Sequence, residues 1–210
     1  MIAFLALFFT SLLVAFSGAM MPGPLLTVTI SESSRRGAIA GPALMVGHAL
    51  LEMILVVGLL LGLGPFLKNE LFFLVIAFVG GSIMFWMAWG MFKSIPTLSV
   101  QTSSTAERKN NLLVAGALMS LANPYWIIWW ATIGIGYIVH AQQFGYWGIA
   151  FFYFGHITGD FVWYSAVSIG ISKGKRIFTD KVYRILIGIC GSFLVGFAFY
   201  LMINAFGKIY

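Results

Sequence analysis

The chain consists of long apolar runs that are separated by short polar segments. A run of about 20 apolar residues is long enough to cross a bilayer as a helix. The pattern predicts six transmembrane helices, at residues 2–30, 39–63, 71–92, 112–138, 146–171 and 184–206. We therefore expect an all-α membrane protein in which every span is helical.

Proline interrupts two of these runs. Pro22-Gly23-Pro24 lies in the first run, and Asn123-Pro124 lies in the fourth. Proline removes a backbone donor and disfavours helix for the residue before it, so the first and fourth helices should be broken near the middle of the membrane. Backbone that is not helical at this depth must be buried in protein or line a cavity. The alternative for each break is a kink that only shapes packing.

Composition agrees with a membrane protein. The chain is 60% hydrophobic and 9% charged, with a mean hydropathy of +0.97, whereas a soluble domain has about 25% charged residues. The net charge of +6 does not point to nucleic acid, because the cations lie in short loops between apolar runs, as membrane topology requires. The one cysteine, Cys190, cannot form an intrachain disulfide.

The cations also predict the orientation of the chain. Most fall in the loops after the first, third and fifth spans: Arg35, Arg36, Lys93, Arg108, Lys109, Lys173, Lys175, Arg176, Lys181 and Arg184. Only Lys68 and Lys208 fall on the other side. The positive-inside rule then predicts a multi-pass protein of the cell membrane with both termini outside. The first 31 residues hold no Lys or Arg and so lack the basic region of a signal peptide, and we expect them to remain as the first span.

One polar motif occurs twice. His48 and Glu52 recur 108 residues later as His156 and Asp160, and each histidine follows a glycine. A histidine and an acid four residues apart lie on the same face of a helix. Ionisable residues inside apolar runs are costly and by default mark a functional site.

The recurrence predicts two copies of a three-helix unit. The first copy would cover residues 1–93 and the second residues 112–210, joined by a cytoplasmic linker at 94–111 that is rich in Ser and Thr. A Gly-Ser pair at 81–82 also matches one at 191–192, at an offset of 110. Because each copy has an odd number of spans, the two copies would have opposite orientations, as in many transporters.

The positions of the acids along their spans predict how the site is arranged. Of six acidic residues, only Glu52 and Asp160 lie within predicted spans, both near the middle of the membrane. We expect a column across the membrane of His156, the two acids and then His48, with the histidines about 10–12 Å apart in depth. Because histidine titrates near neutral pH, such a column suits proton relay.

The fifth span extends this polar face. Tyr164 and Ser168 follow His156 and Asp160 at four-residue steps, so we expect the face to line a pathway. The alternative is that each histidine only bonds to a neighbouring helix. Two pairs in one register argue against that alternative.

The predicted breaks add donors that complement the acids. The half-helices after them would begin at Leu25 and Leu26 and at Tyr125 and Trp126. Helix N-termini present free N–H groups and a positive dipole end, so we expect the residues of both breaks to bind a substrate carboxylate. With the acids available to hold an ammonium group, the sequence predicts a site for a zwitterionic or cationic amino acid.

Three motifs occur in order along the chain: Pro22-Gly23-Pro24 in the first span, Gly47-His48 in the second, and Asn123-Pro124 in the fourth. Together with a Gly-rich third span and short basic loops, they resemble the LysE/RhtB family of amino-acid exporters. The resemblance covers essentially the whole chain and depends on the order and spacing of the motifs.

The resemblance implies a six-helix inner-membrane transporter of two inverted repeats that expels amino acids such as lysine, arginine, threonine or homoserine by proton antiport. It assigns the family's proline motifs to both breaks and its acidic position in the fifth span to Asp160. Glu52 departs from the family pattern, and a second acid favours a more cationic cargo. The expected partners are an amino acid, protons and the lipid bilayer; we expect no cofactor or resident metal.

Other readings fit parts of the pattern. His48, Glu52, His156 and Asp160 could carry a divalent cation, but only if all four met at one point, which the predicted column argues against. Ser120 or Ser168 with a histidine could form an intramembrane hydrolase, although the sequence has no Gly-x-Ser-x-Gly motif. A bundle without transport would leave the matching depths of the two acids unexplained.

Several glycines in the third and sixth spans permit close helix contacts. They are Gly80, Gly81, Gly188 and Gly191. These contacts could form within one chain or in a homodimer.

Overall fold

The computed structural model describes residues 1–63, 69–97, 111–174 and 179–209, and all regular structure in these ranges is helical. The predicted linker at 94–111 lies mostly outside the described residues, as do Lys68, Arg108, Lys109, Lys175 and Arg176. The predicted class, an all-helical protein with apolar helices of membrane-spanning length, is confirmed.

The first half of the chain contains helices α1 (Ile2–Ala19), α2 (Pro24–Arg36), η1 (Gly37–Ile39), α3 (Ala40–Gly58), η2 (Leu59–Leu63), α5 (Glu70–Val75), η3 (Ile76–Gly80), α6 (Gly81–Ser94) and η4 (Ile95–Thr97). The second half contains α7 (Leu112–Leu121), α8 (Pro124–Trp129), η6 (Trp130–Gly134), α9 (Ile135–Gln142), α10 (Gly145–Lys173) and α11 (Asp180–Ile209). The predicted spans therefore coincide with helices to within a few residues.

Both predicted breaks are present. α1 ends at Ala19 and α2 begins at Pro24, and the helical pair α7 and α8 bends by 65° at the second proline motif. In each case proline occupies the first helical position, where its missing N–H and fixed φ are tolerated. The sequence thus ends one helix and starts the next at the same point.

By length and hydropathy, four described helices could cross a membrane, or five if the bent pair is one span. These four are Ile2–Ala19, Pro24–Leu63, Glu70–Thr97 and Asp180–Gly207. α10 is not among them, although its 29 residues exceed the roughly 20 that a span needs. The prediction of six spans therefore goes beyond this count.

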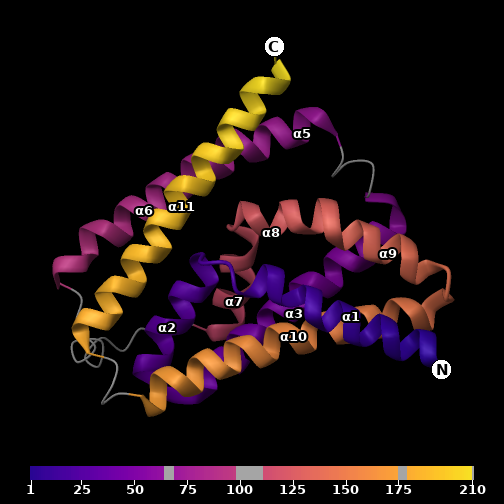
Figure 1. The fold of residues 1–210 in the computed structure, drawn as a ribbon, viewed down its shortest axis with the longest axis horizontal. Helices are drawn as coiled ribbons and strands as arrows, with labels where there is room; N and C mark the ends of the chain where they lie inside the picture. Colours follow the sequence, from indigo (N-terminus) through magenta and orange to yellow (C-terminus); the bar gives the residue numbers. More distant parts are fainter. Residues whose placement is uncertain (64–68, 98–110, 175–178, 210) are drawn as a thin grey trace.

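Helices distant in sequence pack in pairs: α1 on α10, α3 on α7, and α6 on α11. Figure 1 shows α6 alongside α11, on one side of the remaining helices. Gly47 allows the closest approach between α3 and α7, since a Cβ there would overlap the carbonyl oxygen of Leu113. The glycine before His48 therefore brings the backbones of two helices together.

The α6 and α11 pair uses the glycines that were predicted to support close contacts. A Cβ on Gly81 would lie 2.9 Å from Met202, and one on Gly191 would lie 3.0 Å from Phe92. Gly80 faces Pro124 in the same way, at 2.7 Å. These glycines pack inside the chain, so they provide no argument for a homodimer.

Candidate functional site

Four ionisable side chains meet between α3 and α10. His48 Nε2 lies 3.1 Å from Glu52 Oε1 and 3.5 Å from Asp160 Oδ2, and His156 Nε2 lies 3.1 Å from Glu52 Oε2 and 3.3 Å from Asp160 Oδ2. All four are buried. The predicted column, with the histidines two helical turns apart in depth, is wrong, because both imidazoles bend toward the same pair of acids.

Glu52 is held by more donors than the sequence suggested. Its Oε1 accepts hydrogen bonds from the indole N–H of Trp126 at 2.8 Å and of Trp130 at 2.9 Å, in addition to the contact with His48. Its side chain is 1% exposed. A buried charge is tolerated when such polar contacts satisfy it. Trp130 was missed from sequence, although it follows Trp126 by four residues and so shares its helix face.

Ser120, at the end of α7, determines the proton on His48. The Ser120 hydroxyl donates to the carbonyl of Gly116 at 2.8 Å and lies 2.7 Å from His48 Nδ1. A hydroxyl has one hydrogen, so Nδ1 must donate to it. Nε2 faces two carboxylate oxygens and must also carry a hydrogen. His48 is therefore an imidazolium, which offsets one of the two carboxylate charges.

His156 has a different environment. Its ring lies 4.6 Å from the ring of Trp129, centroid to centroid, and 5.5 Å from that of Trp130. Its Nδ1 is buried and has no hydrogen-bond partner among the described residues. Since Nε2 donates to the acids, an unpaired Nδ1 is consistent with a neutral ring.

The two helical breaks differ in the donors that they leave free. At α2, Gly23 is the N-cap and its carbonyl accepts from the N–H of Thr27, but no hydrogen bond joins the N–H of Leu25 or Leu26 to another described residue. At α8, Asn123 accepts from the N–H of Tyr125 through Oδ1 and from the N–H of Trp126 through its carbonyl.

The expectation that both half-helices present free donors is therefore wrong for α8. An asparagine N-cap satisfies the first donors of a helix, and Asn123 supplies that cap. The free backbone donors lie at the start of α2 alone.

The breaks also touch each other. A Cβ on Gly23 would lie 3.3 Å from Asn123 Nδ2. From α8, the Tyr125 hydroxyl donates to the carbonyl of Ser17, and the indole of Trp129 donates to the Ser17 hydroxyl, both at 3.1 Å. The second break is thus bonded to the end of α1.

A cavity of about 40 Å³ connects the breaks to the ionisable cluster. The predicted site residues that line it are Gly23, Leu25, Leu26, His48, Glu52, Asn123, Tyr125, Trp126, His156, Asp160 and Tyr164. Residues not predicted that also line it are Gly18, Ala19, Met21, Ser120 and Trp129. Pro22, Pro24 and Pro124 are not among the lining residues, so their role is to shape the breaks.

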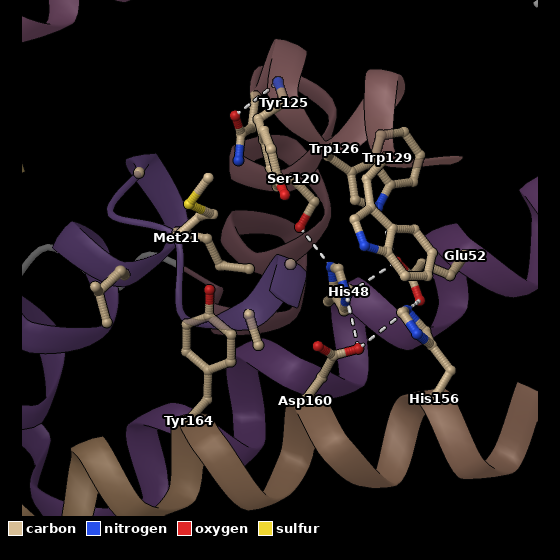
Figure 2. A pocket seen from close by; sticks show the side chains of 16 residues that line it. Met21, His48, Glu52, Ser120, Tyr125, Trp126, Trp129, His156, Asp160 and Tyr164 are labelled. Carbon is tan, nitrogen blue, oxygen red and sulfur yellow. Dashed lines mark hydrogen bonds and ion pairs between the residues drawn. The ribbon is translucent and has the colours of Figure 1, made fainter. Parts of the chain in front are cut away.

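Tyr164 directs its hydroxyl away from α10 into this cavity (Figure 2), and no hydrogen bond joins it to another described residue. Ser168, one turn further, lies outside the cavity. It accepts from the N–H of Gly41 at 2.7 Å and lies 2.7 Å from the Ser33 hydroxyl. The polar face of α10 therefore lines the cavity only as far as Tyr164.

Glu32 also departs from the sequence prediction, which placed it in a loop. It lies within α2 and is buried, with its carboxylate 2.6 Å from Arg36 Nε and 3.5 Å from Arg35. It is not a lining residue of the cavity. Its charge is offset locally by the arginines that end α2.

The geometry bears on both alternative readings. The ligand atoms of His48, Glu52 and Asp160 all lie within 4.8 Å of one another, so the four side chains do meet, as a cation site would require. Ser120, His48 and the acids also form a chain of contacts like that of a hydrolase. However, the Ser120 hydroxyl hydrogen points to Gly116, and no histidine is free to remove it.

Comparison with known proteins gives one result. The sequence profile described as LysE type translocator matches residues 16–205. No curated protein and no solved structure matches the chain. Members of the matching family are membrane transporters rather than enzymes, which agrees with the apolar helices and the buried polar cavity. The resemblance seen in the sequence motifs is confirmed: this chain belongs to the LysE type translocator family.

Proposed function

We propose that this transporter exports amino acids across the cell membrane in exchange for protons. The substrate carboxylate would bind at the start of α2, and its ammonium group would bind beside the acids of the ionisable cluster. Both groups lie at the wall of one cavity. The observation that carries the proposal is this pairing of free backbone donors with buried carboxylates.

The donor end of the cavity suits a carboxylate. The N–H groups of Leu25 and Leu26 lie at the positive end of the 13-residue helix α2, which favours an anion. The free hydroxyl of Tyr164 adds a donor from α10. Three unused donors at one small cavity would be costly if they never received an acceptor.

The acidic end suits exchange with protons. Two buried carboxylates and two imidazoles are in direct contact, so a proton added to the cluster and an ammonium group bound to it neutralise the same negative charge. Competition for one charge is the simplest physical basis for antiport. The cluster thus offers the coupling that an exporter needs.

The topology that we propose has six spans in two inverted repeats, with both termini outside. The contacts support it by their reciprocity. His48 contacts Asp160 as His156 contacts Glu52, and these residues exchange at the offset of 108. Gly81 meets Met202 as Gly191 meets Phe92, which is the same exchange at an offset of 110.

The cavity must enlarge for transport. Its 40 Å³ is far below the roughly 300 Å³ or more of typical small-molecule sites. The conformation described here would therefore be a closed one, from which α2 or α8 must move to admit the substrate.

The test is efflux from vesicles containing the purified protein. Efflux of a labelled amino acid should increase with an opposing proton gradient, stop with a protonophore, and be lost in Asp160→Asn. Asp180→Asn, at the exposed start of α11, is the matched control and should transport normally. Efflux that is independent of the proton gradient, or unchanged in Asp160→Asn, would contradict the proposal.

A divalent cation is the second candidate, because the four side chains meet. Two observations make it weaker. Glu52 Oε1 already faces three donors, and His48 Nε2 carries a hydrogen where a metal ligand needs a lone pair. In the same vesicles, flux of Mn²⁺ or Zn²⁺ without any amino-acid counterflow would favour this candidate.

A further inference from the structure

The two buried acids differ in their capacity to accept another donor. Glu52 Oε1 faces the two indole N–H groups and His48, and Oε2 faces His156. A carboxylate has about four lone-pair positions. Glu52 is therefore saturated by the protein, although it lines the cavity.

Asp160 is not saturated. Both imidazoles contact its Oδ2, whereas its Oδ1 has no contact with another described residue. Figure 2 shows this second oxygen on the side of Tyr164, away from the two imidazoles. The lone pairs of Oδ1 are thus available at a cavity wall.

The difference can be followed in the sequence. Trp126 and Trp130 lie two and six residues after Pro124, and the residues two and six after Pro24 are Leu26 and Ile30. Leucine and isoleucine have no side-chain donor. The second break therefore supplies Glu52 with two indoles, and the first break supplies nothing equivalent to Asp160.

The charges differ in the same sense. The His48 imidazolium offsets one carboxylate charge, and His156 is neutral in this arrangement. One negative charge remains in the cluster, and its only unoccupied oxygen is Asp160 Oδ1. A single ammonium group would complete the site.

The remaining cavity wall has no place for a second cationic group. Near the breaks it is formed by apolar side chains and by the edge of Trp129, together with Gly18, Ala19 and Met21. Glu32, the other buried acid of α2, is outside the cavity and paired with Arg36. A substrate side chain there would contact hydrocarbon and an indole ring.

We propose that the substrate is an amino acid with one ammonium group and an uncharged side chain. Its ammonium binds Asp160 Oδ1, and Glu52 is a positioning residue that never touches the substrate. This inference rests on the proposed export function and narrows it. It reverses the expectation from sequence that the second acid selects a more cationic substrate.

The experiment compares norleucine with lysine, whose side chains differ mainly in a terminal methyl or ammonium group. Counterflow into vesicles should give a kcat/KM for norleucine at least roughly tenfold above that for lysine, since burying an unpaired ammonium costs more than one charge-assisted hydrogen bond. A preference for lysine in the wild type would overturn the inference while leaving amino-acid export intact. Exchange of neither amino acid would instead count against the export function.

Two variants separate the roles of the acids. Glu52→Gln leaves His48 to be balanced by Asp160, so KM should rise by a common factor of roughly ten for both substrates, with the maximal rate and the norleucine-to-lysine ratio retained. Asp160→Asn should abolish exchange of both, whereas Asp160→Glu should restore part of it. A ratio that shifts toward norleucine in Glu52→Gln would place Glu52 in contact with the substrate and overturn the proposal.

Discussion

Glu52 and Asp160 share both of their imidazole partners, although 108 residues separate them in the chain. Each acid contacts the histidine one turn before it and the histidine of the other helix. The four groups therefore titrate as a unit rather than as two independent pairs. Substitutions around this unit should affect stability, proton response and substrate binding to different extents, and the following variants separate these effects.

Trp130→Phe should destabilise the protein because it removes a hydrogen bond to a buried carboxylate. The indole donates to Glu52 at 2.9 Å and is fully buried. Loss of a bond to a charged acceptor costs about 1.5–3 kcal/mol, which should lower the melting temperature by several degrees. Thermal unfolding in detergent measures this. Trp147→Phe is the control, because Trp147 is 72% exposed; equal melting temperatures for the two variants would contradict the assignment.

Ser120→Ala should change the pH range of transport more than the fold. The Ser120 hydroxyl accepts from His48 Nδ1 and so favours the imidazolium. Without it, His48 should lose its proton at a lower pH, and the alkaline limit of transport should move down by about one pH unit for each 1.4 kcal/mol lost. Efflux measured across pH gives the shift.

Ser11→Ala is the matched control for that experiment. Ser11 is equally buried and donates to a carbonyl of its own helix, but it has no printed contact with the cluster. A similar shift in both variants would mean that the effect comes from packing.

Tyr164→Phe should weaken substrate binding without unfolding the protein. The hydroxyl has no hydrogen bond to another described residue, so its removal costs little in the empty state. If it donates to the substrate carboxylate, KM should rise about tenfold. An amino-acid amide, which has no carboxylate, should show a smaller change.

Tyr153→Phe gives the opposite pattern. Its hydroxyl donates to the carbonyl of Ala49 at 2.7 Å and joins α10 to α3. We expect lower thermal stability with a nearly unchanged KM. A larger KM effect in Tyr153→Phe than in Tyr164→Phe would contradict the proposed carboxylate site.

Gly47→Ala should destabilise the α3 and α7 contact, because the new methyl group would overlap the carbonyl of Leu113. Overpacking of this kind costs about 1–3 kcal/mol or more. Gly136→Ala, with nothing within 4 Å of the added atom, should be neutral or stabilising by up to about 1 kcal/mol. Reversible unfolding in a denaturing detergent would compare the two.

The helices and breaks could be predicted because they depend on local properties of the sequence. Apolar run length gives the spans, and the bond geometry of proline gives the breaks near Gly23 and Asn123. The duplicated His and acid positions could likewise be read from spacing alone. In these cases the residue itself carries the information.

The geometry of the cluster could not be predicted in this way. Axial position along two helices gave histidines two turns apart, but a histidine side chain is long enough to reach across to the facing helix. The saturation of Glu52 depends on Trp126 and Trp130, which approach only after α7 and α8 bend. Likewise, Asn123 closes the donors of its own helix, a side-chain bond that a proline motif does not reveal.

The two bonds that Ser17 receives from α8 restrict how the closed cavity can open. Tyr125 and Trp129 hold the end of α1 at both its carbonyl and its hydroxyl, so α1 and α8 would travel as one body unless both bonds break. α2 has no such attachment to Ser17, and its first turn is the flexible margin of the compartment. Access to the buried charge is therefore expected to begin with a displacement of α2, with the α1 and α8 pair serving as the fixed wall.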